Sequence, residues 1–170
     1  MVVLTYDEVE EILGSKNNIP YPKLMNIRQN IRYANLLYDS FAGEKGELTG
    51  VAQYIYEHIE LKRFENFSKI MLSISKEEMH HLELLGDLIK KLGAKPYFIN
   101  NDRSNWHAEN VRYHFKSIYE MLTYNIESEK NAINEYSKVI KYTQNKSIKA
   151  LIERIILDEQ IHLEIFNRMR

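Results

Sequence analysis

The sequence lacks cysteine, has only three prolines in 170 residues, and contains no long uninterrupted run of apolar side chains. Without cysteine the chain can form neither disulfides nor thiolate zinc sites, and it cannot hold a cysteine-bound iron or iron–sulfur centre. Any metal centre must therefore use nitrogen and oxygen ligands. No segment approaches the roughly 18 apolar residues of a membrane span, so we expect a cytoplasmic protein with no membrane partner.

The chain also has no excess of charge of either sign. Its 23 Lys and Arg nearly balance 24 Asp and Glu, which leaves a formal net charge of -1 at pH 7. A field this weak would not draw the protein to nucleic acid or to an anionic membrane surface. We therefore expect no nucleic acid partner.

The scarcity of proline leaves long stretches rich in Leu, Ile, Lys and Glu with helical spacing, which predicts an all-α chain. We divide it into an N-terminal lead-in, residues 1–22, and a four-helix bundle that forms a single domain, residues 23–170. The expected helices are about Lys23–Leu61, Arg63–Leu92, Val111–Tyr142 and Ser147–Met169. The segment from Ala94 to about Glu109 is long enough to cross between the ends of a bundle. Two helical hairpins joined by a crossover result.

Two of these helices carry a buried seam that is interrupted in the same way. The seam of the second helix follows steps of three and four through Phe67, Met71, Ile74, Glu78, His81, Leu85, Leu88 and Leu92. The seam of the fourth runs through Ile148, Ile152, Ile155, Glu159, His162, Phe166 and Met169. Each seam therefore has Glu-x-x-His in its middle. Glu77 and His80 have the same spacing but lie off the seam, and we attribute that pair to chance.

The first and third helices each place one Glu in a seam that otherwise consists mainly of apolar or small residues. The two halves of the chain can therefore be aligned. The matching residues are Glu47 with Tyr54 and then Glu78, and Glu129 with Tyr136 and then Glu159. The pattern is that of a duplicated hairpin. Tyr54 and Tyr136 lie where they could donate hydrogen bonds across the bundle to the opposite carboxylate, although ordinary core tyrosines would have the same spacing.

A carboxylate stays in a protein core only when it is paired or bound to a metal. Glu and His three residues apart share one face of a helix and can reach the same ion. A duplicated hairpin packed on itself would bring four carboxylates and two imidazoles to one depth, an arrangement described for bundles that bind two metal ions. Such ligands suit manganese or iron. The alternative is a buried Glu–His hydrogen-bonded network without metal.

With these residues in place, the chain resembles the ferritin-like superfamily of dinuclear metal proteins from about Tyr33 onward. Gly46–Leu48 and Glu77–Glu83 are most similar to manganese catalases, whereas Asp158–Glu164 is more similar to rubrerythrin. The resemblance implies a ferritin-like four-helix bundle whose metal ligands are Glu47, Glu78, His81, Glu129 and His162. Glu159 would be a sixth ligand in a rubrerythrin-like site, or a catalytic base beside the metals in a manganese-catalase-like one.

The resemblance also implies an oxidoreductase that uses two manganese or iron ions and acts on a small oxidant, hydrogen peroxide or dioxygen. Small residues one turn from Glu47 and Glu129, such as Gly50 and Ala132, leave either room for that oxidant or space for close helix packing. Iron oxidation and storage, or a non-catalytic coat-associated role, remain open. Apolar residues near the start of the first helix predict a homo-oligomer, and we expect a dimer.

Overall fold

The computed structural model describes residues 5–14 and 18–170, and the described residues form helices and loops without a β-strand. The helices in chain order are α1 (Tyr6–Gly14), α2 (Ile31–Asn35), α3 (Tyr38–Ala42), α4 (Glu47–Glu60), α5 (Glu65–Lys91), η1 (Ala108–Asn110), α6 (Ile118–Lys141) and α7 (Lys146–Met169). The chain is all-α, as the sequence predicts.

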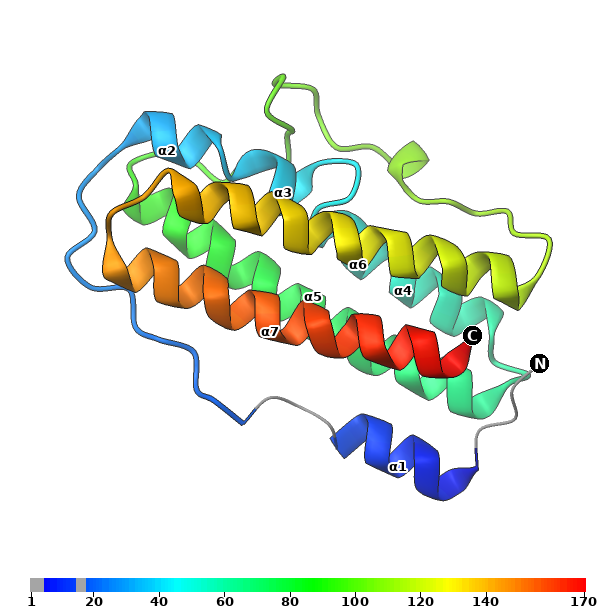
Figure 1. The fold of residues 1–170 in the computed structure, drawn as a ribbon. Helices are drawn as coiled ribbons and strands as arrows, with labels where there is room; N and C mark the ends of the chain where they lie inside the picture. The colour runs from blue at the N-terminus through cyan, green and yellow to red at the C-terminus, as the bar shows by residue number, and fades with distance from the viewer. Residues whose placement is uncertain (1–4, 15–17) are drawn as a thin grey trace.

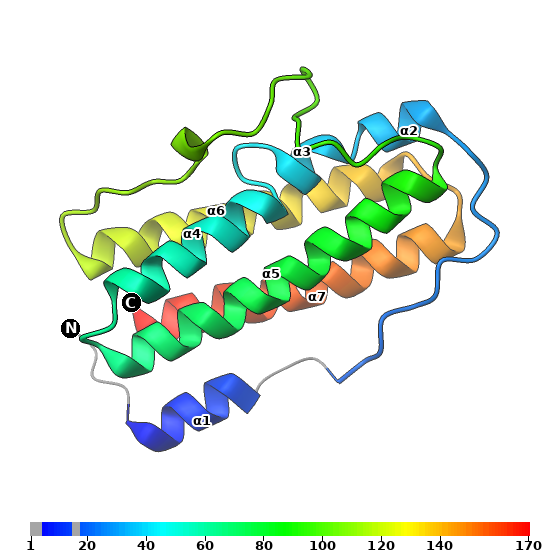
Figure 2. The same cartoon turned by 180° about the vertical axis from the view of Figure 1, so that it is seen from behind.

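Four long helices form a bundle made of two antiparallel hairpins (Figures 1 and 2). α4 packs along α5, and α6 packs along α7. Between the hairpins, residues 92–117 run along the outside of the bundle from the end of α5 to the start of α6, so the crossover is present as predicted. α1 lies outside the bundle against α5.

The first long helix differs from the expectation of one helix over about Lys23–Leu61. It is broken into α2, α3 and α4, and the chain before α2 is extended. The break between α3 and α4 comes from tight turns around two glycines, since a Cβ placed on Gly43 or Gly46 would lie 2.5 or 2.4 Å from the backbone oxygen of Asp39. Only glycine permits this approach. Glu47 is consequently the first residue of α4 rather than a mid-helix residue.

The third long helix also begins later than expected, at Ile118 instead of about Val111. Ser117 caps it by accepting a hydrogen bond from the backbone N–H of Glu120 at 3.1 Å. The preceding crossover is held to the bundle by Trp106, whose indole N–H donates to Thr49 Oγ1 at 2.9 Å. The second and fourth helices agree with expectation to within two residues, and Gly93 follows α5 with a φ of 92°.

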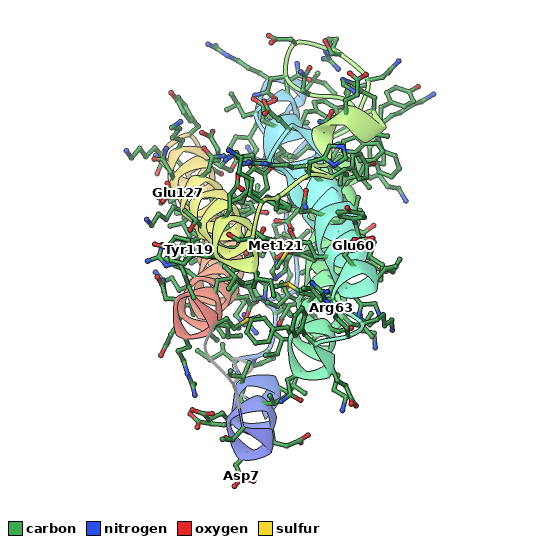
Figure 3. All side chains as sticks on the ribbon, turned by 90° about the vertical axis from the view of Figure 1, so that its right-hand side faces the viewer. Asp7, Glu60, Arg63, Tyr119, Met121 and Glu127 are labelled. Atoms are coloured by element: carbon green, nitrogen blue, oxygen red, sulfur yellow. The ribbon has the colours of Figure 1, made fainter. Side chains whose placement is uncertain are left out.

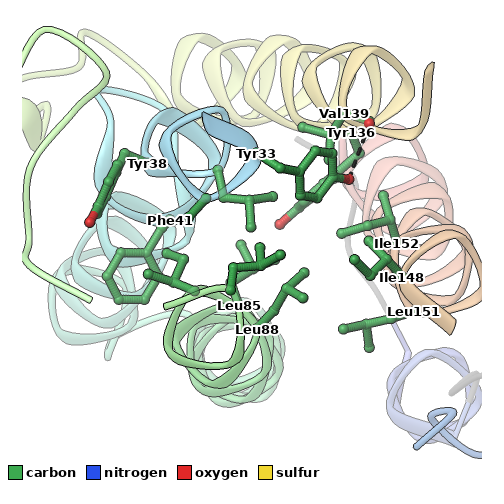
Figure 4. Packing of buried hydrophobic residues seen from close by; sticks show 14 of the residues in the cluster. Tyr33, Tyr38, Phe41, Leu85, Leu88, Tyr136, Val139, Ile148, Leu151 and Ile152 are labelled. Atoms are coloured by element: carbon green, nitrogen blue, oxygen red, sulfur yellow. Dashed lines mark hydrogen bonds between the residues drawn. The ribbon is translucent and has the colours of Figure 1, made fainter. Parts of the chain in front are cut away.

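The core is divided into two apolar clusters with a polar layer between them. One cluster, which includes Leu85, Leu88 and Ile152, fills the end of the bundle near α2 and α3 (Figure 4). The other, which includes Ile74 and Phe166, fills the opposite end. Because the seams of α5 and α7 pass through both clusters, their central Glu and His residues are held at mid-depth.

The described residues include no helix with both the length and the apolar content needed to cross a membrane. Of the apolar residues that led us to expect a dimer, Ile27 and Leu36 pack partly against the core and Ile31 is half exposed. The dimer and the division of the chain at residue 22 stay predictions.

Candidate metal centre

The polar layer brings together all six residues that the interrupted seams single out. Two come from α5, two from α7 and one each from α4 and α6: Glu78, His81, Glu159, His162, Glu47 and Glu129. None is more than 4% exposed. Helical periodicity alone directs the four seam residues inward, whereas the packing of four different helices decides that they meet.

Both histidines turn the same ring nitrogen toward the carboxylates. His81 Nδ1 lies 3.1 Å from Glu159 Oε1, 3.6 Å from Glu47 Oε2 and 3.9 Å from Glu78 Oε2. His162 Nδ1 lies 2.9 Å from Glu78 Oε1 and 3.1 Å from Glu159 Oε2. Glu78 and Glu159 therefore lie between the two imidazole rings.

These atoms form two groups that could each hold an ion. Each group takes one potential ligand atom from each of four residues, and these four atoms all lie within 4.8 Å of one another. The first group is Glu47, Glu78, His81 and Glu159, and the second is Glu78, Glu129, Glu159 and His162. Glu78 and Glu159 belong to both groups, so each can offer one oxygen to either side. The two groups together could hold two neighbouring ions, as in bundles whose helices supply Glu and Glu-x-x-His ligands.

Burial and mutual charge shift the proton affinities of the layer. Burial and the charge of Glu78 raise the pKa of Glu47 and of Glu129. Burial alone would lower the pKa of His81 and His162, but carboxylates hold both pKa values well above their usual range; Glu159 is the leading such partner of each. Positive charge is thus strongly favoured between these carboxylates.

Several buried atoms of the layer have no hydrogen-bond partner. They include Glu47 Oε2, Glu78 Oε1, His81 Nδ1 and Glu159 Oε1, all of which belong to the two groups. Buried polar atoms are rarely left unpaired, and a cation would satisfy these. Four ionised carboxylates would balance the charge of two divalent ions. The donor set of oxygen and imidazole nitrogen fits manganese or iron.

Two tyrosines join the halves of the layer, in the positions that the aligned repeat predicts. Tyr54 on α4 donates to Glu129 Oε1 on α6, and Tyr136 on α6 donates to Glu47 Oε1 on α4. Both phenols are buried. Each bond leaves the second carboxylate oxygen free to face the centre of the layer, so the tyrosines orient the two carboxylates.

The sequence reasoning missed the residues that hold the outer side of each imidazole. Asp158 Oδ2 lies 3.2 Å from His81 Nε2 and also accepts a hydrogen bond from Tyr21 at 2.6 Å. In the other half, Glu77 Oε2 lies 3.3 Å from His162 Nε2. Glu77 does not pair with His80, which is exposed and lies beside Glu83, but its carboxylate contacts the imidazole of the opposite helix, a role that the sequence reasoning did not assign.

A signal for these outer contacts was present in the repeat. Glu77 immediately precedes Glu78, just as Asp158 immediately precedes Glu159. When the far N–H of an imidazole donates a hydrogen bond to a carboxylate, the bond fixes the ring and raises its basicity toward a metal. Hydrogen bonds from His81, Arg154 and Tyr21 outweigh the effect of burial and lower the pKa of Asp158 to about 2, so this carboxylate is ionised.

Small residues leave a cavity beside the carboxylates. It has a volume of about 30 Å³, lies between α4 and α6, and is lined by Gly50, Ala132 and three of the carboxylates, Glu47, Glu78 and Glu129. A Cβ on Gly50 would lie 3.3 Å from Glu78 Oε2. A wider polar cavity of about 410 Å³ reaches Glu47 and Tyr136 from the side of α3. A small molecule could approach the layer from these sides.

Comparison with known proteins places this centre in a family. The family model described as rubrerythrin matches residues 35–170, which include all six residues of the layer. A probable manganese catalase from Clostridium acetobutylicum is 24% identical, and the match covers 82% of this chain and 70% of that protein.

Solved structures share the fold. KatB, a manganese catalase from Anabaena, superposes with a TM-score of 0.80 at 24% identity, covering 91% of this chain and 78% of that one. A bacterioferritin from Desulfovibrio desulfuricans, described with a diiron site, superposes with a TM-score of 0.67 at 24% identity, covering 81% of this chain and 77% of that one. The architecture is therefore the ferritin-like helical bundle that the sequence predicts.

Proposed function

This chain belongs to the rubrerythrin family, and from that membership and the geometry of its polar layer we propose a dinuclear manganese or iron oxidoreductase that acts on hydrogen peroxide or dioxygen. The observation that carries the proposal is the sharing of Glu78 and Glu159 between two groups of ligand atoms. One ion would be held by Glu47 and His81 and the other by Glu129 and His162, with the shared carboxylates between them.

Two such ions supply two-electron chemistry, because each can change its oxidation state by one. The chain provides their surroundings. Asp158 and Glu77 fix the imidazole rings from outside, and Tyr54 and Tyr136 hold the two unshared carboxylates. The cavity beside Gly50 is large enough for an oxidant of a few atoms and too small for most organic substrates.

The proposal is tested on metal-free protein reconstituted with manganese or with iron(II). We expect elemental mass spectrometry to find about two ions per chain and an oxygen electrode to record dioxygen release from added hydrogen peroxide. Zinc-loaded protein is the control, since zinc fits the ligands without changing oxidation state. A folded protein that takes up no metal after reconstitution would refute the dinuclear centre, and loaded protein that neither consumes peroxide nor reduces dioxygen would refute the activity.

Iron oxidation for storage is a second candidate, because a bacterioferritin shares the fold and the layer could bind iron(II). Storage requires a hollow assembly of many chains. Native mass spectrometry of the protein therefore separates the two functions. A small oligomer with peroxide turnover favours the oxidoreductase, whereas a large shell that retains many iron atoms per chain favours storage.

A further inference from the structure

A second buried acid, which the metal centre does not use, lies on the same face of α4. Glu57 is 0% exposed. Its Oε1 accepts a hydrogen bond from Gln53 Nε2 at 2.8 Å, and its Oε2 accepts one from Asn125 Nδ2 at 2.7 Å. Within residues 5–14 and 18–170 no Lys, Arg or His forms an ion pair with it. Two amides from α4 and α6 are its polar partners.

Glu57 lies between two hollows of the protein. On one side it lines a surface cavity of about 220 Å³ at the end of the bundle where Glu60, Arg63 and Met121 lie (Figure 3). On the other side, its partner Gln53 lines the 30 Å³ cavity that contains the carboxylates of the metal centre. That inner volume is enough to hold a water molecule. The Glu57–Gln53 pair therefore lies between the outer cavity and the inner one.

Burial raises the pKa of Glu57 to about 8, although the hydrogen bonds from Asn125 and Gln53 oppose the rise. The charged groups that face it across the outer cavity are Glu60, Arg63 and Lys116. From the loop before α6, the Arg112 backbone bonds Gln53, while its guanidinium pairs with Glu120. The phenols of Tyr54, Tyr56 and Tyr124 lie close enough to interact with the charge of Glu57.

Asn125 is suited to either state of the acid. Its Nδ2 bonds Glu57, whereas its Oδ1 is buried without a partner. A half-turn of the amide would present that oxygen to a protonated Glu57, so the pair can support the carboxylate with a donor or the carboxylic acid with an acceptor. The unused acceptor of Asn125 therefore allows Glu57 to change its protonation state without losing its hydrogen bond.

We propose that Glu57 is a proton relay, which takes a proton from the outer cavity, stores it, and releases it past Gln53 into the inner cavity beside the carboxylates of the centre. The inference rests on the proposed peroxide chemistry. Reduction of one hydrogen peroxide to two water molecules consumes two electrons and two protons, and oxidation of a second hydrogen peroxide to dioxygen returns both. A buried acid can hold one of those protons between the two half-reactions.

A purely structural tie between α4 and α6 would not need an ionisable group here. A glutamine at position 57 has the same shape and carries no charge to bury, and burying an uncompensated carboxylate is costly. The variant Glu57→Gln therefore separates the two roles, because it keeps the packing and removes the proton. Glu153→Gln, which changes an exposed carboxylate on α7, is the matched control.

The first measurement is infrared spectroscopy of zinc-loaded protein, which needs no turnover. We expect a protonated carboxyl band at pH 7 that titrates with a midpoint near 8 and is absent from Glu57→Gln but present in Glu153→Gln. The second is the pH profile of dioxygen release. Wild-type activity should fall as pH rises through about 8. In Glu57→Gln this fall should be absent, and kcat at pH 7 should be lower than in the wild type by about 100-fold or more.

The outcomes separate the relay from the function on which it rests. If Glu57→Gln folds, binds two ions and keeps the wild-type rate and pH profile, the relay is overturned and the metal oxidoreductase stands. If the wild-type protein binds metal but neither turns over peroxide nor reduces dioxygen, both are overturned. If Glu57→Gln fails to fold, Glu57→Asp takes its place, because it retains an acid at this position. Its activity must still fall at alkaline pH; if that fall disappears while the rate is unchanged, the relay is also overturned.

Discussion

Replacing the shared carboxylate Glu78 by Gln should remove both ions, whereas the same change at Glu129 should remove one. Glu78 contributes to both groups of ligand atoms, and Glu129 to only one. An ion present at 100 times its dissociation constant stabilises the folded state by about 2.7 kcal/mol, so two ions contribute about 5 kcal/mol. For a chain of this size that corresponds to roughly 10–20 °C in Tm. Wild type should show this rise on metal addition, Glu129→Gln about half of it, and Glu78→Gln almost none.

The assay is a thermal melt of metal-free and metal-loaded samples, combined with elemental analysis after removal of unbound metal. Glu83→Gln, an exposed change on the same helix, is the control and should behave as wild type. The reasoning is refuted if Glu78→Gln retains two ions per chain with the full rise in Tm, or if the two ligand variants lose metal equally.

Three further predictions follow from other contacts. Gly50→Ala should weaken metal binding about tenfold because its Cβ would press on Glu78 Oε2, whereas Gly14→Ala, with no atom within 4 Å of the added Cβ, should not; equal metal titrations would contradict this. Tyr21→Phe should lower metal affinity about 10–100-fold, as it removes the hydrogen bond that supports Asp158 against an imidazole, and competition with a chelator measures the loss. Because the pKa of Glu57 is raised to about 8 in the folded state, the unfolding free energy should fall between about pH 5 and 8 by up to about 1.4 kcal/mol per pH unit. Chemical denaturation at several pH values should show that the unfolding free energy of Glu57→Gln depends less on pH over this range.

The internal repeat explains why so much of the centre is approximately symmetric. Each half supplies one Glu from its first helix, Glu-x-x-His from its second, and a tyrosine that bonds the Glu of the other half. The outer supports have diverged: Asp158 is also bonded by Tyr21, whereas Glu77 on the other side is more exposed. The two imidazoles therefore have different surroundings, which would give the two ions different affinities and potentials.

Helical periodicity was sufficient for the second and fourth long helices and for the four residues of the polar layer that they carry. A Glu or His in the middle of an apolar seam has to be buried wherever the partner helices lie, so Glu78, His81, Glu159 and His162 could be recognised before their neighbours were known. Glu47 follows from the aligned repeat, although the prediction of one continuous helix over about Lys23–Leu61 is wrong. The break at Gly43 and Gly46 depends on backbone contacts within tight turns, which composition does not reveal.

What the sequence determined by itself was the all-α bundle, the duplicated hairpin and the set of inward-facing Glu and His residues, since these follow from periodicity and spacing along one chain. Only the tertiary structure decided which residues lie outside the imidazoles, how Tyr21 from the N-terminal segment reaches Asp158 on α7, and that Glu57 lies between two cavities. Such contacts join residues far apart in the chain. They depend on how the helices pack and on the path of the loops, which no local pattern records.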